Sequence, residues 1–201
     1  MNTVENLIRV ISRLPGIGPK SGRKIALHLM KNRTTSAQEL VSVITLMQEE
    51  VSECSSCNAL TVGNPCDICS DALRRDEILC IVADVSDLWA LEKAAVFKGR
   101  YFVLGGLLSV FDGITPDDLN IKRLQDRVQA DVQAGLLTEV IIALPATIEG
   151  QTTAHYIAEK IRQVAPHVTV SQPAVGIPVG GELDYLDDNT LQTAISSRLR
   201  L

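Results

Sequence analysis

The sequence predicts an α/β protein built from several parts, and three observations predict it. Apolar residues recur at helical spacing through the first fifty or so positions. Four of the five cysteines then fall within residues 54–69, where that periodicity is lost. From about residue 77 onward, short runs rich in valine and isoleucine alternate with helical stretches. Such alternation is typical of a mostly parallel sheet covered by helices.

Two helices are expected at the start of the chain. The first covers residues 2–13, where Asn2 and Glu5 have the spacing of a capping box. Prolines and glycines between residues 14 and 19 break the helical pattern. A second helix is then expected from about residue 20 to residue 31.

A third helix is expected to begin at Ser36, with Glu39 completing a second capping box. Its apolar side chains fall on one face at helical spacing. They are Leu40, Val43, Ile44, Met47 and Val51.

The remainder of the chain alternates strands and helices. Four short β-prone runs are expected as strands, namely residues 78–83, 101–104, 139–144 and 167–170. Helical stretches are expected near residues 86–97, 121–134 and 151–164. A loop rich in glycine and proline follows from 173 to 181, and a last short helix is expected over 188–199.

The composition is that of a globular protein, with 46% hydrophobic and 21% charged residues. This balance excludes a disordered chain or a coiled coil. No apolar run reaches the roughly 20 residues that a membrane span needs. The first residues lack the basic and apolar regions of a signal peptide. We therefore expect a cytoplasmic protein that does not contact a membrane.

The charge is divided unevenly along the chain. The net charge is −5 overall, but residues 1–33 alone carry +6. The negative overall charge argues against a protein that coats nucleic acid with its whole surface. A basic N-terminal region on an acidic body instead suggests that one end meets a polyanion. The alternative is a basic helix face that is merely solvated.

The cysteines form two Cys-x2-Cys pairs separated by eight residues, namely Cys54, Cys57, Cys66 and Cys69. Each pair can place two thiolates on one side of a tight turn, and two pairs complete a tetrahedral shell for Zn²⁺. Four thiolates leave no open position, so we expect one structural zinc per chain. Two disulfides or an iron–sulfur cluster are the alternatives. Cys80 lies in an apolar strand and is expected to be a packing residue.

A second motif is LPGIGPKS at residues 14–21. Two glycines beside one apolar residue allow a tight turn to direct backbone N–H groups outward at the start of a helix, where an anion binds. This is the helix–hairpin–helix pattern of sequence-independent DNA binders. The expected DNA contacts are Gly16, Gly18, Lys20, Arg23 and Lys24. The alternative is a simple connection between two helices.

These motifs follow one another in an order that resembles the bacterial RecR family of recombination proteins. The resemblance extends over essentially the whole chain. Its further markers are GRYFVLGGLLS and DGITPDDL within 99–119, TIEG at 147–150 and GIPVGGELDY at 176–185.

The resemblance implies a Toprim domain and a role without catalysis. It implies a mediator of DNA repair that acts with RecO, and with RecF in some settings. Such a mediator helps to load the recombinase onto single strands covered by single-strand-binding protein. It also implies a homo-oligomeric ring, a dimer or tetramer, around DNA. The Toprim surface near Glu149 is the expected partner-binding site.

Two positions depart from the family pattern at the Toprim acids. Ala83 stands where the family has a glutamate at the end of the first strand, and Gln151 stands where it has an acid. The incomplete acid set argues against a magnesium-dependent nuclease or primase-like enzyme. Two more functions compete with the mediator role: a helix–hairpin–helix DNA glycosylase, and a zinc-stapled protein-interaction module without DNA contact.

The resemblance divides the chain into four expected regions. They are a helix–hairpin–helix DNA-binding region over 1–53, a four-cysteine zinc finger over 54–69, a Toprim domain over 77–172, and a C-terminal loop and helix over 173–201. The last region is expected to make oligomer contacts, because its apolar residues exceed what a free tail exposes. These residues are Ile177, Val179, Leu183, Tyr185, Leu191 and Ile195.

Overall fold

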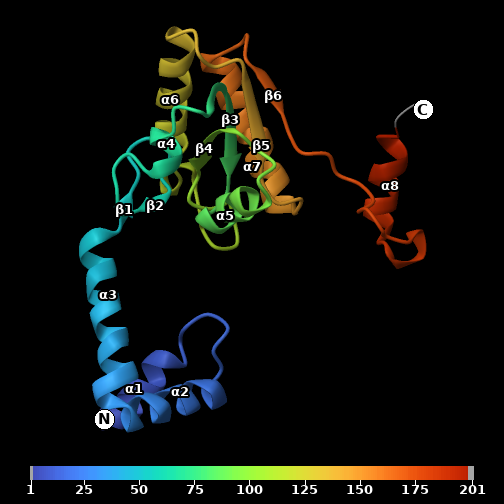
Figure 1. Cartoon of the computed structure of the whole chain (residues 1–201). Helices are drawn as coiled ribbons and strands as arrows, with labels where there is room; N and C mark the ends of the chain where they lie inside the picture. Colours follow the sequence, from blue (N-terminus) through green and yellow to red (C-terminus); the bar gives the residue numbers. More distant parts are fainter. Residues whose placement is uncertain (1, 199–201) are drawn as a thin grey trace. The chain divides into compact units, whose positions relative to one another are not determined.

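The computed structural model describes residues 2–198 and divides the chain into two compact units (Figure 1). Unit 1 ends at Val51, and unit 2 begins at Ser52. In the described part of the chain, no helix is long and apolar enough to cross a membrane.

Unit 1 is entirely helical, as expected. Its elements are α1 (Thr3–Ile11), α2 (Pro19–Lys31), a π-helical turn (Arg33–Ala37) and α3 (Gln38–Glu50). The expected capping box is present at α1, where the Asn2 side chain accepts from Val4 N and Glu5 accepts from Asn2 N. Gly22 lies where α2 crosses α1, and an added Cβ there would collide with Ser12. The glycine therefore permits the close contact of the two helices.

The predicted start of the third helix was wrong. Ser36 lies within the π-helical turn, and α3 begins at Gln38 without a side-chain cap. The reason is that the backbone of the preceding turn already supplies helical hydrogen bonds: Ala37 N donates to Asn32 O, and Gln38 N donates to Thr35 O. Donors satisfied in this way need no capping side chain.

The apolar face predicted for α3 is present but is not buried. No described residue of α3 is buried, and its large apolar side chains are between 44% and 58% exposed. These are Leu40, Val41, Val43, Ile44, Leu46 and Met47. A helix that exposes this much apolar surface lacks a covering element within unit 1.

Unit 2 opens with a small knuckle and continues as an α/β sheet. The knuckle consists of β1 (Ser52–Glu53), β2 (Leu60–Thr61) and α4 (Asp67–Ser70). The alternating elements are β3 (Arg75–Val82), α5 (Val85–Ala94), β4 (Gly99–Val103), α6 (Ile121–Gln133), β5 (Glu139–Ala143), α7 (Ile148–Val164) and β6 (Thr169–Ser171). The strands are parallel and ordered β4-β3-β5-β6, which confirms the predicted sheet.

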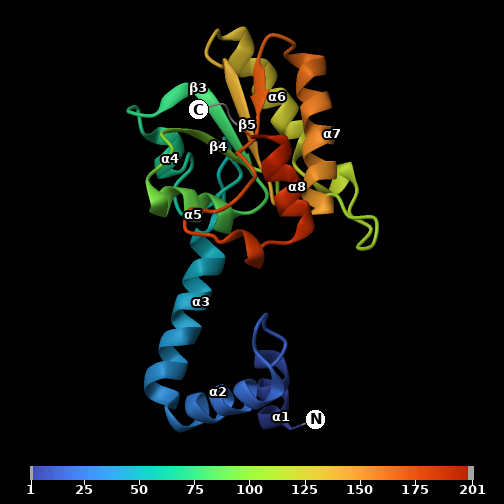
Figure 2. The ribbon, with the colours of Figure 1, turned by 90° about the vertical axis from the view of Figure 1, so that its right-hand side faces the viewer.

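Helices cover both faces of this sheet (Figures 1 and 2). Alternate strand residues such as Leu79 and Ile81 point to one face and pack with α6 and α7. Cys80 and Val82 point to the other face and pack with α5 and the cysteine knuckle. The knuckle is therefore part of one of the two cores.

The chain after β6 continues as an extended segment. It contains a short 3-10 turn (Leu183–Tyr185) and α8 (Asp188–Ser196). The last helix was predicted over 188–199, of which residue 199 lies outside the described residues. Several of its apolar side chains are exposed, including Val179, Tyr185 and Ile195.

Candidate nucleic-acid interface and metal centre

The turn between α1 and α2 presents the start of α2 to solvent. Gly16 has a φ of +76°, a left-handed conformation that strains any residue with a Cβ. Gly18 then precedes α2 with an extended backbone, and Pro19 occupies the first turn. The first N–H groups of a helix have no intrahelical acceptor. Those of Lys20 and Ser21 are therefore directed at solvent, in the geometry that binds an anion.

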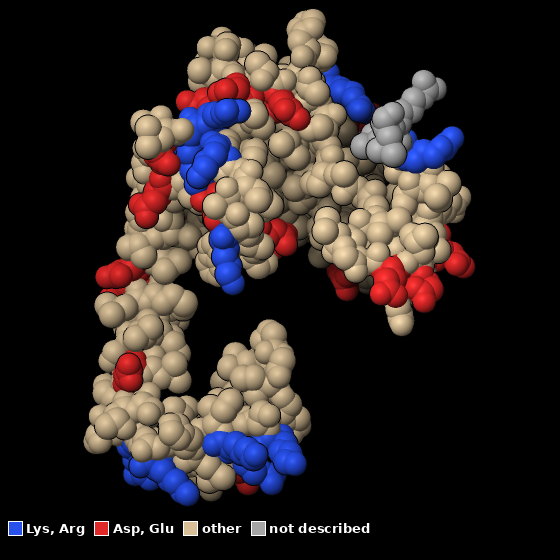
Figure 3. Space-filling model, turned by 45° about the vertical axis from the view of Figure 1, so that its right-hand side comes forward, with Lys and Arg blue, Asp and Glu red and all other residues tan. Residues whose placement is uncertain are grey.

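The basic residues predicted beside this turn share one helix. Lys20, Arg23 and Lys24 lie exposed on α2, at the spacing of one helical face. Within residues 2–51 as described, none of them forms a salt bridge. Figure 3 shows lysine and arginine gathered over α1 and α2, with little acidic surface among them. The expected contacts thus form one basic surface.

The four predicted metal ligands converge. The Sγ atoms of Cys54, Cys57, Cys66 and Cys69 all lie within 4.8 Å of one another. Those of Cys57 and Cys66 are 3.6 Å apart. Bonds of about 2.3 Å to a tetrahedral zinc place sulfur atoms about 3.8 Å apart. The four cysteines therefore fit one structural zinc, and none of them forms a disulfide in the structure.

Three of these thiols have pKa values shifted from the ordinary value of a cysteine. Burial raises the pKa of Cys66 to about 11, with the nearby Cys57 contributing. The pKa of Cys57 is raised further by its hydrogen bond with Cys69 and by burial. For Cys54, backbone donors led by Cys66 N outweigh the effect of burial and lower the pKa to about 6. Zinc binds thiolates, so metal binding at this cluster releases the protons that Cys57 and Cys66 hold in its absence.

Arginines from the sheet and from α6 hold the knuckle in place. Arg100 Nη1 donates to the carbonyl oxygens of Ile68 and Cys69, at 2.7 and 3.1 Å. Arg127 Nη1 donates to Ser56 O at 3.0 Å. Sequence reasoning missed these contacts, because nothing in the local pattern relates α6 to the cysteines.

Three carboxylates of the α/β region accept hydrogen bonds at the starts of helices. Asp84 and Asp87 form a capping box at the start of α5. Asp118 accepts from the backbone and side chain of Thr115. Ala83 follows β3 directly and is buried. The described residues hold no group of three or more metal-ligating side chains apart from the four cysteines.

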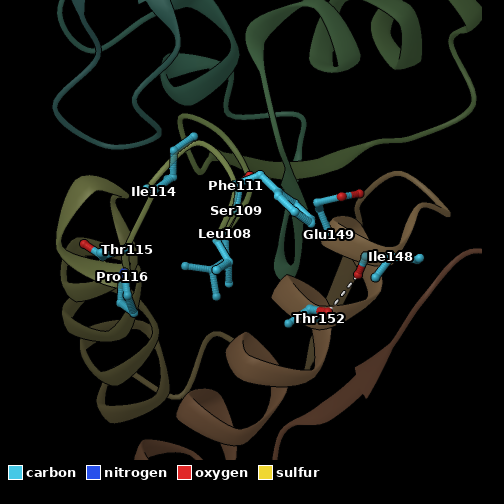
Figure 4. Close-up of a pocket in the computed structure, with 11 residues that line it drawn as sticks. Leu108, Ser109, Phe111, Ile114, Thr115, Pro116, Ile148, Glu149 and Thr152 are labelled. Atoms are coloured by element: carbon cyan, nitrogen blue, oxygen red, sulfur yellow. Dashed lines mark hydrogen bonds between the residues drawn. The ribbon is translucent and has the colours of Figure 1, made fainter.

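Glu149 borders an apolar groove that the sequence did not predict. It lies in the first turn of α7, behind the cap residue Thr147, whose Oγ1 accepts from Gly150 N. The groove has a volume of about 530 Å³ and lies between residues 108–116 and the start of α7 (Figure 4). A signal was present in the adjacent Val110 and Phe111, two large apolar residues next to a turn.

Four protein-family models match consecutive segments of the chain, in the same order as the parts described above. Residues 4–47 match the model of the RecR helix-hairpin-helix, and residues 51–71 match that of the RecR zinc finger domain with four cysteines. Residues 77–174 match the Toprim domain, and residues 176–198 match the RecR C-terminal model.

Full-length relatives agree with these models. "Recombination protein RecR" from Rhodospirillum rubrum is 50% identical over 97% of this chain and 96% of its own length. The proteins of that name from Parvibaculum lavamentivorans and Xanthobacter autotrophicus are each 49% identical, over 97% and 98% of this chain and 95% and 96% of their own lengths. The chain belongs to the RecR family.

Membership of the RecR family confirms the resemblance inferred from the motifs. It confirms the order of helix–hairpin–helix, zinc finger and Toprim parts, and it identifies the cysteine knuckle as the family's zinc finger. It excludes the glycosylase alternative, because the hairpin is followed by a zinc finger and a parallel sheet. The individual DNA contacts and the role of Glu149 remain predictions.

Proposed function

We propose that this RecR-family chain is a DNA-binding recombination mediator without catalytic activity. In this role it acts with RecO, and with RecF, to help load the recombinase onto single strands covered by single-strand-binding protein. A cytoplasmic location beside the nucleoid follows from that role. The observation that carries the proposal is the exposed, unpaired basic surface around the start of α2 in a chain of net charge −5.

The proposed DNA contacts are to phosphates. Gly16 and Gly18 allow the backbone to approach the strand, and Lys20, Arg23 and Lys24 supply positive charge beside it. A helix N-terminus contacts phosphate oxygens and does not read base edges. Binding is therefore expected without sequence preference.

The absence of catalysis is supported by the Toprim acids. Ala83 cannot bind a metal ion or transfer a proton. The carboxylate oxygens of Asp84 and Asp118 accept hydrogen bonds at helix starts, and among residues 2–198 the four cysteines are the one group of three or more side chains placed to hold a metal ion together.

The proposed assembly is a homo-oligomeric ring, a dimer or tetramer. Its support is the exposed apolar surface at two places: α3 in unit 1 and the segment around Val179, Tyr185 and Ile195. Several basic surfaces in one ring raise the effective concentration of each DNA contact. Light scattering at micromolar concentration should give a dimer or tetramer mass.

Reconstituted recombinase loading tests the function. The recombinase, RecO and single-stranded DNA covered by single-strand-binding protein are mixed with or without the chain, and the DNA-dependent ATPase of the recombinase is followed. We expect a shorter lag with the chain present. The same preparation should not cleave or extend DNA with Mg²⁺. An unchanged lag would contradict the mediator role and favour the interaction module without DNA contact.

A further inference from the structure

The groove beside Glu149 has the form of a protein docking site. Its floor is Leu108, which also packs against the main core (Figure 4). Around it stand large apolar side chains that almost entirely face solvent: Val110 is 96% exposed, Phe111 is 97% exposed and Ile148 is 84% exposed. Large apolar side chains exposed together around a concave apolar surface are typical of the centre of a protein–protein interface.

The loop that carries Phe111 is held in a defined conformation. Ser109 and Ile114 exchange backbone hydrogen bonds at 2.8 and 3.2 Å. Ser109 Oγ donates to Asp112, and the N–H of Leu108 donates to Thr153 Oγ1 on α7. The apolar tip is therefore presented by a fixed turn, so little ordering is needed when a partner binds.

The charge around the groove selects one kind of partner. Asp112, Asp117, Asp118 and Glu149 lie in the two segments that form or adjoin it. Residues 101–121 and 128–159 contain no lysine or arginine at all. A segment that combines a large apolar side chain with flanking basic residues is complementary to both properties.

We propose that the groove binds a partner-protein segment with one large apolar side chain inserted between Phe111 and Ile148 and with lysine or arginine on either side. This deepens the proposed interaction with RecO, for which the family resemblance implies the surface near Glu149, and it rests on that proposed function. The apolar contact supplies the affinity. The acidic side chains in and next to the groove, led by Glu149, favour basic partners over acidic ones.

The experiment measures binding of purified RecO to the full, zinc-loaded chain by calorimetry. The test variant carries Phe111→Ser with Ile148→Ser, and the control carries Leu73→Ser, a side chain that is 92% exposed outside the groove. All three side chains are exposed, so the fold should be kept, which circular dichroism checks. We expect affinity to fall at least about tenfold for the test variant and to stay unchanged for the control.

A second variant tests the charge. Asp117→Asn with Glu149→Gln should weaken the salt dependence of RecO binding while leaving DNA binding unchanged.

The outcomes separate this inference from the proposed function. Equal RecO binding by wild type and the Phe111/Ile148 variant would overturn the groove alone. No RecO binding by wild type would overturn the partner role itself. A fall in oligomer mass for the variant would show that a second copy of the chain occupies the groove, which also overturns the inference.

Discussion

The backbone N–H of Val103 donates to the carbonyl oxygen of Cys57 over 2.8 Å. Val103 ends β4, which is an edge strand of the sheet, and its own carbonyl oxygen accepts from Asn58 Nδ2 at 3.2 Å. Unpaired edge strands are prone to pair with other chains. The zinc knuckle therefore supplies hydrogen-bond partners to the end of β4, whose backbone groups on this side have no neighbouring strand.

Removal of zinc should destabilise unit 2. A metal that binds only the folded chain, at about a thousandfold above its Kd, contributes about 4 kcal/mol, or about 8–16 °C in melting temperature. Calorimetry with and without chelator measures the shift, and light scattering follows aggregation through the uncovered β4 edge. Zinc added back should restore the original transition. An unchanged melting temperature after verified loss of zinc would contradict the coupling.

Cys80 should be unreactive in the folded protein. It is 3% exposed, and burial raises the pKa of its thiol to about 12. Alkylation needs the thiolate, which is nearly absent there at about pH 8. Mass spectrometry of the zinc-loaded chain treated with iodoacetamide should find no modified cysteine, whereas chelation in denaturant should give all five. Modification of Cys80 in the native protein would place it outside the core.

Features fixed by neighbouring residues could be predicted from the sequence. The capping box of Asn2 and Glu5 and the two Cys-x2-Cys pairs depend on local spacing, and both are present. The parallel sheet was predicted because short runs rich in valine and isoleucine alternate with helical stretches along the chain, and the structure confirms it. Ser36 has the right spacing for a cap, but the chain before it stays helical and no cap is needed.

Features that depend on distant packing could not be predicted. Periodicity placed the apolar residues of α3 on one face but gave no information on whether another element covers them. The groove depends on the start of α7 lying beside the loop of Phe111, almost forty residues earlier in the chain. The contacts of Arg100 and Arg127 with the knuckle depend on tertiary structure in the same way.

Glu92→Gln should destabilise unit 2 in a pH-dependent manner. Arg74 forms a bidentate ion pair with Glu92, with one contact of 3.0 Å, and the two side chains are 11% and 26% exposed. Burial alone raises the pKa of Glu92, but this ion pair outweighs it and lowers the pKa below the ordinary 4.5. Its contribution is therefore complete above about pH 4.5 and is lost as the pH falls further.

Urea unfolding of wild type and variant between about pH 3 and 7 measures this contribution. The difference in unfolding free energy should be about 1–3 kcal/mol at neutral pH and should shrink toward zero in acid, where Glu92 is protonated. Acid release of zinc affects both proteins equally and cancels in the difference. Glu159→Gln, at an exposed position of α7, is the matched control. A difference that is constant with pH would mean that packing, not charge, is lost.

Lys20→Gln with Lys24→Gln should weaken DNA binding equally for all sequences. Both side chains are exposed on α2 beside its free N-terminus. Each lost phosphate contact flattens the log–log dependence of affinity on salt by about 0.9 on duplex DNA and about 0.7 on single strands. The double variant should therefore lose about 1.8 units of slope on duplex DNA, measured by fluorescence anisotropy at several salt concentrations.

The control for this change removes the same charge elsewhere. Lys98→Gln with Lys122→Gln changes two exposed lysines of unit 2, one of them paired with Asp126, and should leave the slope unchanged. An equal loss of slope in both double variants would mean that DNA binding depends only on the net charge of the protein. No loss in either would make the α2 surface a solvated helix face. Affinity that depended strongly on base sequence would also contradict the model, because the donors at the start of a helix contact phosphates, which are the same at every base.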